Sequence, residues 1–120
     1  LLRAAQDVVT LLAQSGVYMD DLPADGAGRP DLWRRFAAGE RGDAVAPIAA
    51  ALDAQSLDIA GTMMRRDEVF RDVAHHFLRH FDRLLTAKAP DFDDDTLAGF
   101  ADTRSARAFA LLARVTGMLG

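Results

Sequence analysis

His76 and His80 have the types and spacing of a metal-binding pair. Side chains four residues apart project from one face of a helix, and imidazole nitrogens are common ligands of Zn²⁺ and other transition metals. Asp72 extends the same row one turn earlier. Its backbone lies about 12 Å from that of His80 at roughly 1.5 Å rise per residue, so the two cannot bind one ion together. Further ligands would have to come from another segment.

Two other interpretations compete with a metal site at these residues. On a helical wheel the two histidines flank Val69 and Val73 at the edge of an apolar stripe, where amphipathic side chains usually lie. We therefore interpret them as boundary histidines and keep the metal site as the alternative. A pH-sensitive contact between His76 and Asp72 is a third interpretation, because a neighbouring carboxylate can raise the pKa of an imidazole across neutral pH.

The stretch DFDDDT, residues 91–96, places four carboxylates in five positions. Its alternate aspartates align with the first ligands of an EF-hand calcium loop, and Asp102 would be the last. The alignment fails at Thr96, where the loop needs glycine, and at Pro90, which interrupts the incoming helix. Aspartates also favour helix N-termini, where they accept hydrogen bonds from free amide groups. We therefore predict capping residues here rather than a calcium site.

A second acidic group lies in the longest irregular stretch, which runs from Val17 to Arg29 and into the next helix. If folding brought these side chains beside His76 and His80, a site of mixed oxygen and nitrogen ligands would form. We interpret them instead as part of a solvated loop. The residues are Asp20, Asp21, Asp25 and Asp31.

The net charge of -4 and the absence of cysteine restrict the chemistry further. Binding to a phosphate backbone draws its affinity from a basic surface, so no nucleic-acid partner is expected. Arg65 and Arg66 could precede a recognition helix, but that helix carries most of the predicted core. No phosphate loop, dinucleotide fingerprint or nucleophile elbow occurs. The sequence therefore assigns no catalytic residue and no cofactor, and it leans against an enzyme.

Two features favour a protein partner or self-association. Trp33 is flanked by Arg34 and Arg35, and tryptophan and arginine are enriched at the energetic centres of interfaces. The spacing of Trp33 from Phe36 equally suits a core residue. The first helix has a broad apolar arc, which implies burial on more than one side, either within the bundle or against a second subunit.

Apolar residues recur at helical spacing along almost the whole chain, and no alternating run is long enough for a strand. Capping residues, glycines and prolines divide the chain into helical segments. These are 1–14, a helix from Pro30 to Gly39, a third from Asp43 or Ala46 through Leu52, a turn or two around 56–64, a long helix over 67–87, a turn at 97–101 and a last helix capped by Asp102.

The helix over 67–87 is the clearest, because Asp67 would cap it and Pro90 forbids its continuation. Its apolar residues cover little more than a quarter of the circumference. The sequence therefore predicts an all-α fold, a single domain over 1–120 packed as a compact bundle of five or six helices, irregular or orthogonal, with 67–87 as the central helix.

The chain starts at Leu1 without methionine and without a capping residue, so we expect a fragment of a longer protein. Thirteen arginines against one lysine and the absence of asparagine are typical of a high-GC bacterial genome. No stretch is long and apolar enough for a membrane span, so a cytoplasmic location is expected unless an apolar anchor precedes Leu1. The predicted function is a non-catalytic protein-interaction or oligomerisation module; the alternative is a metal-binding domain that uses His76 and His80 with loop aspartates.

Overall fold

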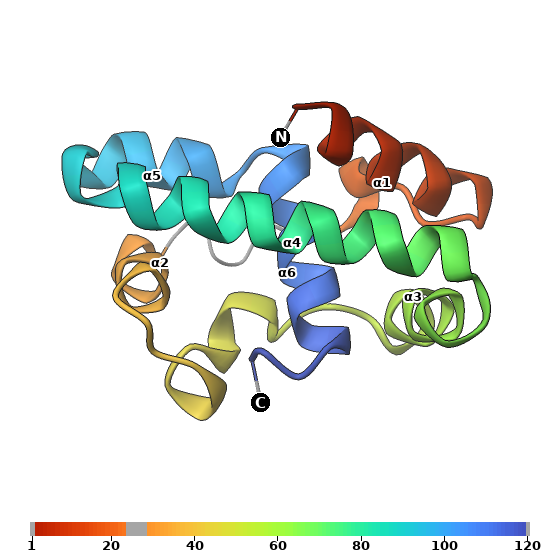
Figure 1. Ribbon diagram of the computed structural model, residues 1–120. Coiled ribbons are helices and arrows are strands. Elements are labelled where there is room, and N and C mark those ends of the chain that lie inside the picture. Colours follow the sequence, from red (N-terminus) through yellow and green to blue (C-terminus); the bar gives the residue numbers. More distant parts are fainter. Residues whose placement is uncertain (1, 24–28, 120) are drawn as a thin grey trace.

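The computed structural model of the chain describes residues 2–23 and 29–119. These two ranges contain α-helices and short 3-10 turns but no strand, which confirms the all-α fold (Figure 1). No helix within them has both the length and the apolar character needed to cross a membrane. The α-helices are α1 (Leu2–Gln14), α2 (Pro30–Ala37), α3 (Ala54–Arg66), α4 (Glu68–Lys88), α5 (Asp94–Ala101) and α6 (Arg104–Val115), and the 3-10 turns are η1 (Met19–Asp21), η3 (Gly42–Ala44), η4 (Ala46–Ala49) and η5 (Ala89–Asp91).

The helix α4 is the longest, with 21 residues, and its bounds agree with the sequence. The Asp67 side chain accepts a hydrogen bond from the Phe70 amide at 3.0 Å, as the capping prediction requires. At its other end η5 begins at Ala89 and contains Pro90. The helix packs against α1, α3 and α6 and lies along one side of the molecule, with its outer face toward the viewer of Figure 1.

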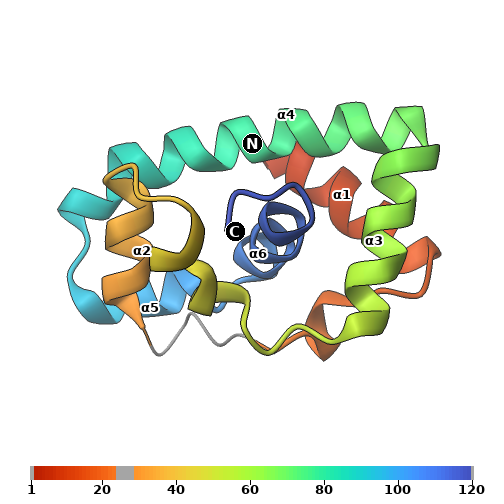
Figure 2. The same ribbon diagram turned by 90° about the horizontal axis from the view of Figure 1, so that it is seen from below.

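The helix with the most continuous burial is α6, which Figure 2 shows end-on in the middle of the other helices. Four alanines on α6 leave room for its neighbours to approach closely, and α1, α3, α4 and α5 all contact it. The sequence predicted α4 as the central helix; α4 does supply a large part of the core, but α6 is the helix enclosed on most sides. Its buried residues are Ala106, Ala108, Phe109, Ala110, Leu111, Leu112 and Ala113.

Aromatic rings join α2, α4 and α6 in the core. Phe81 stacks on Phe109 with ring centroids 4.2 Å apart, and Trp33 lies 6.3 Å from Phe81 and 6.2 Å from Phe109. Phe36 meets Phe109 edge-on at 5.4 Å. Such pairs contribute beyond their buried area, so this cluster fixes how the three helices pack.

Three element predictions are wrong. The segment expected as a third helix forms the turns η3 and η4 instead, because the backbone at Val45, between them, leaves the helical conformation with φ -116° and ψ 0°. The short segment expected from Ser56 is the 13-residue helix α3, capped by Asp53, whose carboxylate accepts from the Ser56 amide at 2.9 Å. The last helix is capped by Thr103, and Asp102 ends α5.

Candidate functional site

The outer face of α4 carries a row of side chains that contribute nothing to the core. At about 100° per residue, every member lies within about 60° of the direction of His76. All are exposed except His80, which is half-buried, and Val69 is 68% exposed. We call this set the α4 row: Val69, Asp72, His76, Arg79, His80, Arg83 and Ala87.

The two histidines at the middle of the α4 row contact each other. Their ring centroids are 4.2 Å apart with the planes tilted by 50°. Neither ring has a hydrogen bond or ion pair to any other residue in the described ranges. Partial burial, together with the charges of His76, Arg83 and Arg79, lowers the pKa of His80 below its usual value. A lowered pKa keeps this imidazole neutral, with a free lone pair, at neutral pH.

A groove of about 370 Å³ lies beside the row, between α1 and α4. Ala4 and Val73 form its apolar floor, while Arg3 and Asp7 come from α1 and Asp72 and His76 from α4. Neither aspartate has a hydrogen-bonding or ion-pair partner among the residues that the structure describes. The groove thus carries two carboxylates, Asp7 and Asp72, and one guanidinium, Arg3, and this excess of negative charge suits one further guanidinium or ammonium group.

Most arginines outside the α4 row form hydrogen bonds to other residues of the chain. Arg41 donates to the carbonyl of Phe36, Arg71 to that of Met64 and Arg107 to that of Met19, at 2.7 to 3.0 Å. In contrast, Arg79 and Arg83 make no hydrogen bond or ion pair within the described part of the chain.

A complete metal site is not assembled. Within residues 2–23 and 29–119, no three histidine, aspartate or glutamate side chains are placed to hold one ion. His76 and His80 could therefore supply at most two ligands, and the rest would be water or side chains from another molecule. Asp72, the third metal candidate, lies on the groove wall beside His76.

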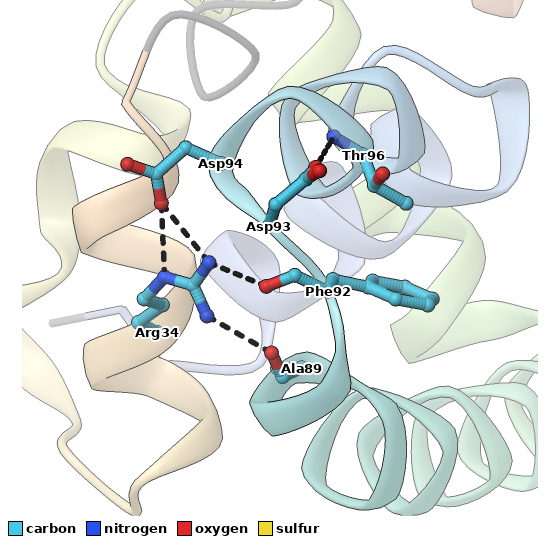
Figure 3. Close-up of polar contacts among 6 residues, drawn as sticks. All are labelled: Arg34, Ala89, Phe92, Asp93, Asp94 and Thr96. Carbon is cyan, nitrogen blue, oxygen red and sulfur yellow. Dashed lines mark hydrogen bonds and ion pairs between the residues drawn. The ribbon is translucent and has the colours of Figure 1, made fainter.

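The acidic stretch after α4 is tied to α2 and α5, as Figure 3 shows. Asp93 caps α5 by accepting from the Thr96 amide at 2.7 Å, which confirms the capping prediction and lowers the pKa of this carboxyl. Arg34 donates to the carbonyls of Ala89 at 2.9 Å and Phe92 at 2.7 Å and pairs with Asp94 at 3.0 Å. These carbonyls and carboxylates are used in holding α2 against the end of α4.

Two aspartates of the earlier acidic group, Asp20 and Asp31, are also paired within the chain. Asp20 accepts two hydrogen bonds at 2.9 Å from Arg104 of α6, and Asp31 pairs with Arg29. Asp21 lies in η1, and Asp25 lies outside the described residues. The structure does not bring Asp20, Asp21 or Asp31 to the histidines as a metal-binding group.

The residues proposed as an interaction anchor are divided between core and surface. Trp33 is 1% exposed and belongs to the aromatic core, so it offers no surface to a partner. Arg34 is engaged as described above, and Arg35 is exposed. Of these three residues, only Arg35 is left as an exposed side chain that a partner could contact.

Sequence reasoning missed Arg3, Asp7 and Arg83 as members of a site. Arg3 and Asp7 lie one turn apart on α1, which resembles an ordinary surface pair, yet the structure places both on the groove wall facing α4. No local signal in a single sequence tells which helix lies beside α1. A helical wheel predicts that Arg83 is exposed, but it does not show that Asp7 and Asp72 lack partners.

Searches of protein-family models, curated proteins and solved structures found no match to this chain. The function must therefore be argued from the α4 row and the groove themselves.

Proposed function

We propose that this domain is a non-catalytic protein-interaction module that acts by self-association through the outer face of α4. The proposal rests on which charged side chains have hydrogen-bonding or ion-pair partners within the chain. Arg29, Arg34, Arg41, Arg71, Arg104 and Arg107 bind carbonyls or carboxylates of the same chain. Arg79, Arg83 and Asp72 have no such partner among the described residues, and these three side chains lie together on one face of α4. Arginine is favoured at interfaces because its planar guanidinium binds carboxylates with two parallel hydrogen bonds.

Several aspartates and a threonine, residue types that a catalytic site could use, have a structural role in this fold. Asp53, Asp67 and Asp93 cap helices, and the hydroxyl of Thr103 caps α6. A carboxylate that accepts a backbone amide is committed to holding a helix end. The α4 row and its neighbouring groove are free of such a capping role.

Measurement of mass against concentration tests the proposal. We expect light scattering and sedimentation to show a mass that rises from the monomer toward the dimer between micromolar and near-millimolar protein. The association should weaken as salt is added, because exposed charges are screened over about 10 Å at 0.1 M ionic strength. A mass that stays at the monomer value throughout would contradict self-association.

Metal binding is the second candidate function, and the contact between His76 and His80 favours it. An ion that binds only the folded state, present at a concentration 100 times its Kd, raises the free energy of unfolding by about 2.7 kcal/mol. Under this candidate, Zn²⁺ should raise the melting temperature of the wild type but not of His76→Ala/His80→Ala. Equal shifts in the two proteins, or none in either, would exclude the histidine pair as the binding site.

A further inference from the structure

We propose that the occupant of the α4 row is the α4 row of a second copy of this chain, packed antiparallel, with Arg83 of each copy facing Asp72 of the other at the edge of the α1/α4 groove. This inference rests on the proposed self-association and specifies its surface. The order of residues along the row supports this pairing.

The α4 row is self-complementary when read in opposite directions. If two α4 helices cross antiparallel with the centre midway between His76 and His80, His76 of one copy lies level with His80 of the other. Val69 then lies level with Ala87. Asp72 and Arg83 fall within one residue of each other along the axis, a rise of about 1.5 Å. Opposite charges and apolar side chains therefore meet in pairs.

Asp72 and Arg83 also lie on the same flank of the row. At about 100° per residue, both are displaced from His76 in the same rotational direction, by about 40° and 20°. A two-fold axis keeps equivalent flanks on the same side, so the two side chains face each other rather than across the helix. Arg79 lies farthest out on this flank, where its long side chain can extend into water beside the pair.

The groove supplies the receiving half of the contact. Asp72 and Asp7 stand on its α4 and α1 walls, and both lack a hydrogen bond or ion pair to other described residues. Arg83 has five N–H donors and likewise has no hydrogen bond or ion pair to the rest of the described chain. Pairing with Arg83 satisfies Asp72, Asp7 on the α1 side of the groove adds negative charge nearby, and the two-fold axis makes this contact twice.

The pairing also accounts for the exposure of Val69. Val69 is 68% exposed on α4, and Tyr18 is the only other large hydrophobic side chain so exposed among the described residues. In the antiparallel arrangement Val69 packs on the methyl group of Ala87, which is itself exposed in the monomer. One helix pair buries less than the roughly 1,200–2,000 Å² of a standard interface, so the dimer is weak and forms at high concentration.

A charge exchange between two variants tests the pairing. In the homodimer of Arg83→Glu two acidic side chains face each other at both contacts, and in that of Asp72→Arg two basic ones do. We expect each variant alone to self-associate about tenfold more weakly than the wild type. An equimolar mixture regains association, because the native Asp72 of one chain meets the native Arg83 of the other, while the two introduced side chains, which have opposite charges, pair at the second contact. Both positions are exposed, so the variants should keep the wild-type melting temperature.

Arg35→Glu is the matched control, because it makes the same charge change at an exposed arginine on α2. We expect it to associate like the wild type. If the wild type associates and both α4 variants weaken association but their mixture stays as weak as its components, the antiparallel pairing is wrong and self-association through α4 stands. If Arg35→Glu weakens association and the α4 variants do not, the interface does not lie on α4 and both the pairing and the proposed function are wrong. If the wild type never associates, both fail.

Introduced cysteines give a second readout that does not depend on a strong dimer. The chain contains no cysteine, so Val69→Cys and Ala87→Cys carry the only thiols. Positions 69 and 87 are about 27 Å apart along one helix, and a disulfide needs Cα atoms within about 7 Å. Under mild oxidation we expect a disulfide dimer in the mixture of the two variants and little in either alone. Cross-linking of Val69→Cys alone would show parallel pairing and overturn the inference.

Discussion

Arg34 connects three segments through one guanidinium. It reaches the carbonyls at the end of α4 and after η5 and the carboxylate of Asp94 in the first turn of α5 (Figure 3). The sequence singled out this arginine as an interaction residue because of its neighbour Trp33. Its internal partners could not be found from the sequence, because they lie more than 50 positions away.

Replacement of Arg34 by methionine should destabilise the fold by about 2 kcal/mol, since charge-assisted hydrogen bonds to two carbonyls are lost. Arg35→Met is the matched control, because Arg35 is exposed and makes no hydrogen bond within the described chain. It should change stability by less than about 0.5 kcal/mol. Chemical denaturation of the two variants measures both values. Similar losses in both would show that the Arg34 contacts contribute little.

The lowered pKa of His80 predicts a pH dependence of stability. Partial burial comes first among its causes, and the folded state therefore disfavours the charged ring relative to the unfolded chain, whose pKa is near 6.5. Stability is full above that value and falls as the pH drops toward the lower pKa of the folded state, because the unfolded chain binds the proton first.

We expect the wild type to lose more stability than His80→Gln when the pH is lowered from neutral to about pH 5. Thermal melts at the two pH values measure the difference. His75→Gln, an exposed position on the same helix, should behave like the wild type. The opposite sign, a relative gain at low pH in the wild type, would mean that an acidic partner dominates at His80.

Helix α3 shows how packing overrides local propensity at the scale of an element. The sequence predicted a turn or two here because Gly61 weakens a helix, yet α3 extends over 13 residues. Gly61 is buried against α6, where Val115 approaches, so the helix is held by its neighbour rather than by its own composition. The segment over 43–52 differs in the opposite direction: its apolar spacing predicted a helix, but the backbone at Val45 leaves the helical conformation and only short turns form.

Gly61→Ala should stabilise the protein by about 0.5–1 kcal/mol, because glycine costs that much in a helix interior. The added methyl would lie 3.9 Å from Val115 and 3.2 Å from the Arg65 guanidinium, which is the end of a flexible side chain and can move. Gly39→Ala should destabilise instead, because φ at Gly39 is +103°. Denaturation midpoints test both signs. A loss in Gly61→Ala would show that Arg65 cannot give way.

The whole molecule is organised around α6. Its alanines allow the surrounding helices to approach, and Arg104 and Arg107 connect it to the η1 segment more than 80 positions earlier. The C-terminal helix therefore holds together segments from both ends of the chain. That arrangement leaves α4 with one face in the core and one face free for a partner.

Ala108→Leu should destabilise the fold by roughly 1–3 kcal/mol, because extra methylenes cannot be accommodated at a fully buried position. Ala54→Leu, at the exposed start of α3, should change stability by less than about 0.5 kcal/mol. Unfolding followed by circular dichroism compares the two. An Ala108→Leu protein as stable as the wild type would show that α6 is loosely packed.

The sequence by itself determined the helical class, the bounds of α4 and the caps at Asp67 and Asp93. Each of these depends on interactions within about one turn of helix, which periodicity and residue type display directly. The sequence placed His76 and His80 at the edge of the apolar stripe of α4; His80 is half-buried, as that position implies, whereas His76 is exposed.

Only the tertiary structure decided that α6 is the enclosed helix, that Trp33 is core, and that Asp7 of α1 stands across a groove from Asp72 of α4. These facts depend on which helix packs beside which, and that choice is made by contacts between residues far apart in the chain. A single sequence shows the faces of its helices, but the packing of the whole core selects their neighbours.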